Sequence, residues 1–184
     1  MSGFYLETER LRLRSWRGDD AAAFHLVNGD PEVMATLGPV MRLDEVVALI
    51  ERMQRIEAEL GHCFWAMERR DDNRLVGWCG AIVGSAGPIT GKREIGWRMA
   101  RDCWGQGLAS EAARATIAWL FANRPDEALW AITSTDNFRS RAVMQRLGMT
   151  YRPDLDFDHP RLAEDDPLLR HVTYELRRDE WARR

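Results

Sequence analysis

The stretch Trp104-Gly105-Gln106-Gly107-Leu108-Ala109-Ser110-Glu111-Ala112 joins a strand-like segment, residues 94–100, to a helix-like segment, residues 108–121. Two glycines at such a corner allow the backbone to turn tightly and to approach a ligand closely. The first N–H groups of the new helix have no partner within that helix, and the helix dipole favours an anion beside them. The stretch therefore predicts a cradle for a phosphate or pyrophosphate group.

Two common phosphate-binding motifs do not fit this corner. No lysine follows Gly107, as a P-loop requires, and Ser110 occupies the position of the third glycine in a dinucleotide-binding fingerprint. A Gly-x-Gly pair also occurs in tight strand-to-helix turns that bind nothing. The two glycines by themselves thus leave two interpretations open, an anion cradle and a simple turn.

The composition predicts one soluble domain over residues 1–184, with 45% apolar and 30% charged residues. A net charge of −3 argues against a general nucleic-acid binder, and no apolar run approaches the roughly 20 residues of a membrane span. The N-terminus lacks an apolar signal core, and Cys63, Cys79 and Cys103 fit no metal-binding spacing. We therefore expect a cytoplasmic protein with reduced thiols, no metal site, and no nucleic-acid or membrane partner.

Hydrophobic periodicity predicts the element order. Leu11–Arg14 alternates with period two, as in a strand, whereas apolar residues from 44 to 60 recur every three to four positions, as in a helix. Further strands are expected at 63–68, 75–83, 93–100, 129–133, 149–152 and 171–176, and further helices from 20, from 31, at 108–121 and at 137–147, with a loop at 154–167. Hairpins come first and β-α-β crossovers follow, so we expect an α/β (α+β) fold with a mixed sheet covered by helices.

This order, with a Gly-x-Gly corner after the fourth predicted strand, resembles the GNAT superfamily of acyl-CoA-dependent N-acetyltransferases. Residues 104–109 match the family's Gln/Arg-x-x-Gly-x-Gly/Ala loop, although Trp104 stands where Gln or Arg is usual. Thirty residues later, Asn137-Phe138-Arg139-Ser140, with Leu147-Gly148-Met149 beyond it, matches the family's Asn-x-Arg-Ser helix. The resemblance implies a mixed, mostly antiparallel sheet of about seven strands flanked by about four helices.

The resemblance also implies acetyl-CoA as the cofactor, because the fourth strand, the loop and the next helix hold coenzyme A in that family. It assigns cofactor contacts to the main chain of Met99, Ala100 and Arg101, to Asn137, and to Arg139 at the 3′-phosphate. The loop residues expected to contribute are Trp104, Gly105, Gln106, Gly107, Leu108, Ala109 and Ser110.

One branch of the family is especially similar. The opening Thr8-Glu9-Arg10-Leu11-Arg12-Leu13-Arg14 and the loop segment look like the Rim-type ribosomal-protein N-terminal acetyltransferases and their relatives. The match extends over about residues 7–181. Dimers are common in that branch, so a homodimer is expected for this chain as well.

Acetyl transfer to an amine requires a base, and Glu94 is the preferred candidate. Strict alternation along its strand places Glu94 on one face with Gly96 and Arg98. A glutamate that is merely solvated, or salt-bridged beside Arg93, is the alternative interpretation. Glu111 is a poorer candidate, because the helix dipole alone favours an acid in a first helical turn.

The proton donor to the leaving thiolate is less clear from the sequence. In the family, the position seven residues after the motif Asn often carries a tyrosine with this role, but here that position is Met144, which has no proton to give. By resemblance, Ser140 is the nearest remaining candidate for a catalytic acid.

Two histidines lie near the C-terminal strand. His171 and Tyr174 are three residues apart on that strand and therefore face opposite sides, so either one is a candidate to line the cleft. His159 is expected to fix its own loop. A His–carboxylate metal site is disfavoured, because close neighbours in sequence rarely converge on one ion.

We therefore expect an acetyl-CoA-dependent N-acetyltransferase that transfers an acetyl group directly to a primary amine. The acceptor is either a protein N-terminal α-amine or a small amine. Met144 supports an alternative, a non-catalytic acyl-CoA-binding sensor of the same fold. A nucleotide-binding fold unrelated to coenzyme A is the third interpretation.

Overall fold

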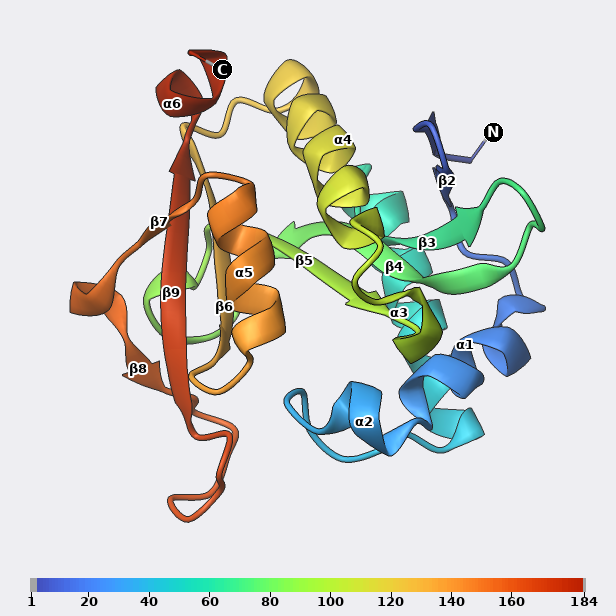
Figure 1. Ribbon diagram of the computed structural model, residues 1–184, viewed down its shortest axis with the longest axis horizontal. Helices are drawn as coiled ribbons and strands as arrows, with labels where there is room; N and C mark the ends of the chain where they lie inside the picture. The colour runs from blue at the N-terminus through green and yellow to red at the C-terminus, as the bar shows by residue number, and fades with distance from the viewer. Residues whose placement is uncertain (1–2, 184) are drawn as a thin grey trace.

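One nine-stranded sheet organises residues 3–183, the part of the chain that the computed structural model describes (Figure 1). The strand order is β1-β2-β3-β4-β5-β6-β9-β7, with β8 paired to β9. Only β5 and β6 are parallel among the strand pairs of these residues, so the sheet is mixed and mostly antiparallel. The strands are β1 (Tyr5–Glu7), β2 (Leu11–Arg14), β3 (Phe64–Arg69), β4 (Leu75–Val83), β5 (Arg93–Met99), β6 (Ala128–Ser134), β7 (Thr150–Tyr151), β8 (Phe157–Asp158) and β9 (Arg170–Arg177).

Helices cover both faces of this sheet. They are α1 (Asp20–Asn28), α2 (Pro31–Met34), α3 (Leu43–Leu60), α4 (Leu108–Asn123), α5 (Phe138–Arg146) and α6 (Arg178–Ala182). In Figure 1, α4 and α5 lie in front of the sheet and α3 lies behind it. No helix within residues 3–183 is both long enough and apolar enough to span a bilayer.

The predicted fold class is confirmed, with three differences in detail. Strand β1 was not predicted, so the strand expected to be the fourth is the fifth, β5. The segment expected to be a loop, 154–167, contains the two-residue strand β8, and α6 follows β9. These elements are short, and β1 and β8 are strands because β2 and β9 pair with them, so their own residues carry too little periodicity to reveal them.

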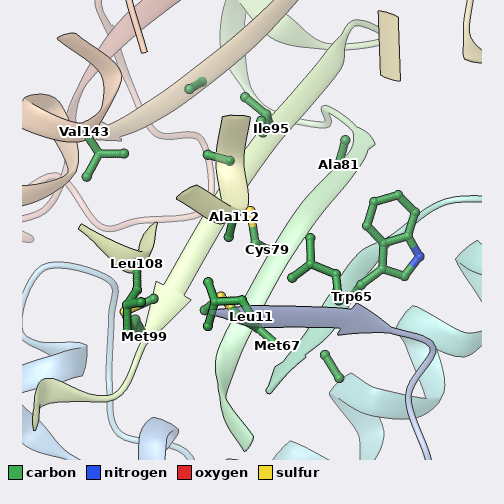
Figure 2. Packing of buried hydrophobic residues seen from close by; sticks show 14 of the residues in the cluster. Leu11, Trp65, Met67, Cys79, Ala81, Ile95, Met99, Leu108, Ala112 and Val143 are labelled. Atoms are coloured by element: carbon green, nitrogen blue, oxygen red, sulfur yellow. The ribbon is translucent and has the colours of Figure 1, made fainter. Parts of the chain in front are cut away.

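The two faces of β5 have different environments. Ile95 and Met99 are buried in the core, and Figure 2 shows Met99 beside Leu108 of α4. Arg98 lies on the opposite face, where it donates a hydrogen bond to Asn28 of α1. The predicted alternation along β5 is therefore confirmed, and the face that carries Glu94, Gly96 and Arg98 is turned away from α4.

The sheet divides between β5 and β6. β5 pairs with β4 at seven positions, but it pairs with β6 at one position only, Glu94 with Trp130. The N–H of Ala100 donates to Val76 O on the β4 side at 2.8 Å. Since main-chain groups alternate in direction along a strand, those of Trp97 and Met99 point away from β4, toward the edge where β5 and β6 diverge (Figure 1).

Candidate active site

The glycine corner adopts the conformation that a close-approach loop requires. After β5, a 3₁₀ turn (Arg101–Cys103) leads to Gly105 and Gly107, whose φ angles are +74° and +78°. Residues with a side chain rarely adopt this left-handed region. Gly107 is the N-cap of α4, and no side chain caps this helix. The N–H groups of its first turn are therefore directed out of the corner, as the sequence predicted.

A buried hydroxyl marks the same corner. Ser110 Oγ lies in the first turn of α4, is shielded from solvent, and has no hydrogen-bond partner within residues 3–183. Leaving a buried polar group unpaired costs about 1–3 kcal/mol, so such atoms are rare unless a ligand satisfies them. The hydroxyl and the first-turn N–H groups together fit an anion such as a diphosphate.

The N-terminal segment braces the loop from outside. Arg10 Nη1 donates to Gln106 O at 2.9 Å, and Glu111 accepts hydrogen bonds from Thr8 Oγ1 at 2.6 Å and from the Arg10 N–H at 2.8 Å. Burial would raise the pKa of Glu111, but these hydrogen bonds outweigh it and hold that pKa below its usual value. Glu111 thus links the first turn of α4 to the segment between β1 and β2. A carboxylate with a lowered pKa is a weak base, so Glu111 is poorly suited to act as the general base.

Replacing Glu111 with glutamine should therefore damage the fold more than the chemistry. The Glu111→Gln variant loses the charge that orders Arg10 and Thr8, so we expect it to lose about 1–3 kcal/mol of unfolding free energy. Its kcat should fall far less than the ~10²–10⁴-fold typical of a lost general base. Thermal unfolding and steady-state kinetics measure the two quantities, and a large drop in kcat with unchanged stability would contradict this role.

Helix α5 packs beside α4 and β6. Asn137 caps it: its Oδ1 accepts from Ser140 N at 3.1 Å, and its Nδ2 donates to Thr133 Oγ1 at 2.9 Å. The Arg139 guanidinium lies 4.4 Å from the centre of the Trp104 ring, and Trp104 Nε1 donates to Met99 O at 2.9 Å. The structure thus connects the two sequence motifs directly, a contact that no spacing rule predicted.

The main chain of the three residues expected beside the cofactor is partly engaged. The Ala100 N–H donates to Val76 O, and Arg101 O accepts from Trp104 N at 3.1 Å. The main-chain groups of Met99 point to the open edge of β5. Those of Trp97 do so as well, although Trp97 was not among the predicted residues. Because the Ala100 N–H points to β4, the main-chain groups of Trp97, three residues earlier, point to the open edge. This direction is known only from the pairing of β4 with β5.

A pocket of about 220 Å³ lies beside β5, β6 and β9. Glu94, His159 and His171 contribute its titratable groups, and the other lining residues are Thr36, Leu37, Ile132, Thr133, Ser134, Leu162 and Leu168. The two imidazole rings are 4.9 Å apart, and burial lowers the pKa of both histidines. Ser134 Oγ donates to Thr36 O at 3.1 Å, which fastens the segment after α2 to the pocket.

The structure decides between the two candidates on the last strand and corrects a third residue. His171 lines the pocket, whereas Tyr174 is 1% exposed in the core. His159 was expected only to fix its loop, but it also lines the pocket. The antiparallel pairing of Phe157 with His171 brings His159 alongside, which the sequence could not indicate because β8 was missed.

Glu94 lies in this pocket without an ion-pair partner within residues 3–183. Burial raises its pKa to about 7, against the opposing effect of Arg161 and Arg52. The neighbouring Arg93 instead bonds to Asp126 at 3.2 Å, so the alternative of a Glu94–Arg93 salt bridge is wrong. A carboxyl group that titrates near neutral pH is suited to accept a proton at that pH.

The predicted acid and base are not brought together in one pocket. Ser140 lies in the first turn of α5 and is not among the residues that line the pocket with Glu94. Met144 is 1% exposed in the core. Any role of Ser140 would thus be on the cofactor side of the cleft.

The sequence pattern of the acetyltransferase (GNAT) domain matches residues 10–150. The chain belongs to this family. It is 32% identical to the uncharacterized protein YkkB of Bacillus subtilis (strain 168) over 147 residues, 79% of this chain and 85% of YkkB. An acetyltransferase from Agrobacterium tumefaciens str. C58 has 25% identity and a TM-score of 0.77, with 97% of this chain and 96% of that chain covered.

A third similar protein carries a ligand in its structure. It is RimL, a ribosomal L7/L12 α-N-protein acetyltransferase in complex with coenzyme A, with a TM-score of 0.77 over 96% of this chain and 99% of RimL. Its sequence identity of 17% shows a shared fold only. Acetyl-CoA-dependent N-acetylation is the general activity of the GNAT family to which this chain belongs.

Proposed function

We propose that this GNAT member transfers an acetyl group from acetyl-CoA directly to a primary amine positioned beside Glu94. The observation that carries the proposal is the position of Glu94. It lines a pocket at the point where β5 and β6 separate, on the sheet face opposite α4. The acceptor is a small amine or the α-amine of a protein N-terminus.

The residues around the corner suit coenzyme A, which supplies the acetyl group as a thioester. We assign the diphosphate to the first-turn N–H groups of α4 and to the unpaired Ser110 hydroxyl. The main chain of Trp97 and the N–H of Met99 are assigned to the amide-bearing arm, since Met99 O already accepts from Trp104 Nε1. Arg139, exposed and stacked on Trp104, is assigned to the 3′-phosphate.

The pocket side supplies the proton chemistry. An amine reaches the enzyme mostly as an ammonium ion, and Glu94 takes one proton from it directly or through water. Main-chain N–H groups on the open edge of β5 are suited to hold the oxyanion that develops at the carbonyl. For the departing thiolate, Ser140 is the proposed donor, since Met144 has no proton to give.

The finer predictions rest on the sequence motifs. Thr8–Arg14 and the loop segment favour the Rim-type branch, and the clamp of Thr8 and Arg10 on Glu111 gives that opening motif a structural role. We infer a homodimer from the resemblance to that branch. We also infer a cytoplasmic location, which is supported by the three buried, unpaired cysteines.

A thiol-release assay with a panel of amines separates an enzyme from a sensor. We expect acetyl-CoA to raise the melting temperature and at least one amine to trigger thiol release, with intact-mass spectrometry showing one added acetyl group on that acceptor. Stabilisation by acetyl-CoA without thiol release for any amine would favour the sensor. Stabilisation by ATP or NAD but not by coenzyme A would contradict the assignment of coenzyme A and favour a nucleotide-binding fold.

A further inference from the structure

Arg98 is a largely buried cation with no carboxylate partner. Its Nη1 donates to the Asn28 amide oxygen, its Nε has no hydrogen-bond partner, and it forms no ion pair with any residue from 3 to 183. Burial lowers the pKa of Arg98 to about 10. Removing an unpaired charge from water is costly, so a ligand that supplies the missing anion would relieve this cost.

Arg98 and Glu94 lie under the same chain segment. The segment 28–41 closes on itself through a hydrogen bond from Met41 N to Asn28 O at 3.0 Å, and both of these residues contact Arg98. Its middle part supplies Thr36 and Leu37 to the pocket that contains Glu94. Arg98 is therefore at one end of this covered face of β5 and the pocket is at the other.

Two aromatic rings lie between the two ends. The strand rise separates the Cα atoms of Glu94 and Arg98 by about 13 Å. Gly96 lies between them, and the stacked rings of Phe64 and Trp78, with centroids 4.0 Å apart, cover it. An elongated small molecule can lie along such a surface with its two ends near the two charged residues.

The other charges acting on the pocket are positive. Arg161 and Arg52 are the charged residues that act on Glu94, and Arg161 also acts on His159. The acidic run Glu164-Asp165-Asp166 is absent from the lining of this pocket. A polyamine or a basic peptide would therefore meet arginines here, whereas an acceptor that carries its own anion would be attracted.

We propose that the acceptor is a small amine bearing a carboxylate, with Arg98 binding that carboxylate while the amine reaches Glu94. This assignment rests on the proposed acetyltransferase function and selects the small-amine acceptor. Charge-assisted hydrogen bonds from an arginine to a carboxylate are strong and directional, so Arg98 would act as a specificity residue.

Matched acceptors test the proposal with the unmodified protein. Glycine, β-alanine and γ-aminobutyrate are each compared with their carboxamides, with kcat/KM corrected for the fraction of neutral amine. We expect at least one acid to exceed its carboxamide by about 10- to 100-fold, the range for a charge-assisted hydrogen bond. Higher kcat/KM values for polyamines or basic peptides than for every acid would overturn the proposal.

Variants test whether the preference for the acid over its carboxamide depends on Arg98. Arg98→Met should abolish the preference for the acid by raising its KM, with the KM for acetyl-CoA and the rate with the carboxamide unchanged. Arg98→Lys should retain part of the preference, and Asn28→Asp should reduce it by giving Arg98 an internal carboxylate. Arg55→Met, an exposed position on α3, is the matched control.

The outcomes separate this proposal from the function on which it rests. If Arg98→Met lowers kcat/KM equally for acid and carboxamide, Arg98 is structural and the proposal is wrong, although amine acetylation stands. If acetyl-CoA binds but no amine is acetylated, the proposed function itself fails. Should Arg98→Met not fold, the comparison of acids with carboxamides in the unmodified protein still tests whether the acceptor carries a carboxylate.

Discussion

The Gly107→Trp variant is expected to bind coenzyme A at least about 100-fold more weakly than the unmodified protein, equivalent to about 2.7 kcal/mol. At φ +78° a side chain strains the backbone, and the bend that directs the first-turn N–H groups of α4 would have to change. Space is not the obstacle inside the protein, since an added Cβ would meet only Arg10 Nη2 at 3.7 Å. The expected loss of affinity therefore comes from the changed bend, which would no longer let the backbone approach the ligand closely.

Gly91 provides a matched control for backbone strain. Its φ is +79°, and an added Cβ would meet no atom within 4 Å, but it lies in the turn before β5. Gly91→Trp and Gly107→Trp should lose similar unfolding free energy, whereas only Gly107→Trp should lose affinity in calorimetric titration with coenzyme A. Equal affinity in the two variants would show that the corner is a simple turn.

The second large effect is expected for Glu94→Gln, which should lower kcat/KM at pH 8 by about 10²–10⁴-fold without changing coenzyme A affinity. Glu94 must be deprotonated before it can take a proton from the bound ammonium ion. Below the Glu94 pKa of about 7, log kcat/KM should therefore rise with pH with a slope of one, and above it the profile should stay level up to the pKa of the amine, whereas the variant depends on amine that is already neutral. The variant should show a slope of one throughout.

The same substitution should stabilise the protein at alkaline pH. The folded-state pKa of Glu94, about 7, lies above the ordinary glutamate value of 4.5, so the folded protein binds more protons than the unfolded chain between these values. This carboxyl therefore destabilises the fold as pH rises through that window, by about 1–3 kcal/mol at pH 8. Glu94→Gln should melt at a higher temperature at pH 8 and show no gain at pH 4. An unchanged pH–rate profile together with an unchanged melting temperature would remove Glu94 from the mechanism.

Local rules were sufficient to predict the conformation of the glycine corner, the cap of α5 and the alternation along β5. Gly107 needs a left-handed φ, Asn137 accepts an N–H three residues on, and Ile95 and Met99 alternate with Glu94, because each of these depends on neighbours in the chain. Ser110 was predicted as part of the loop from the same motif. Its burial without a partner, however, depends on how α4 packs on the sheet.

The surroundings of Glu94 and Arg98 depend on contacts between segments that are far apart in the sequence. His159 reaches the pocket through pairing of β8 with β9, and Arg98 meets Asn28 across 70 positions of sequence. The pKa of Glu94 rises because elements far apart in the chain exclude water from it together. None of these effects has a spacing signature within one strand or helix.

The sequence by itself determined the order of the main elements, the glycine corner and the family, since periodicity and turn chemistry act over a few residues. The tertiary structure alone decided which charges are buried, which of them lack partners, and which side chains share the pocket with Glu94. Burial and electrostatics are properties of the packed chain, because they depend on the distances between segments and on the water that packing excludes.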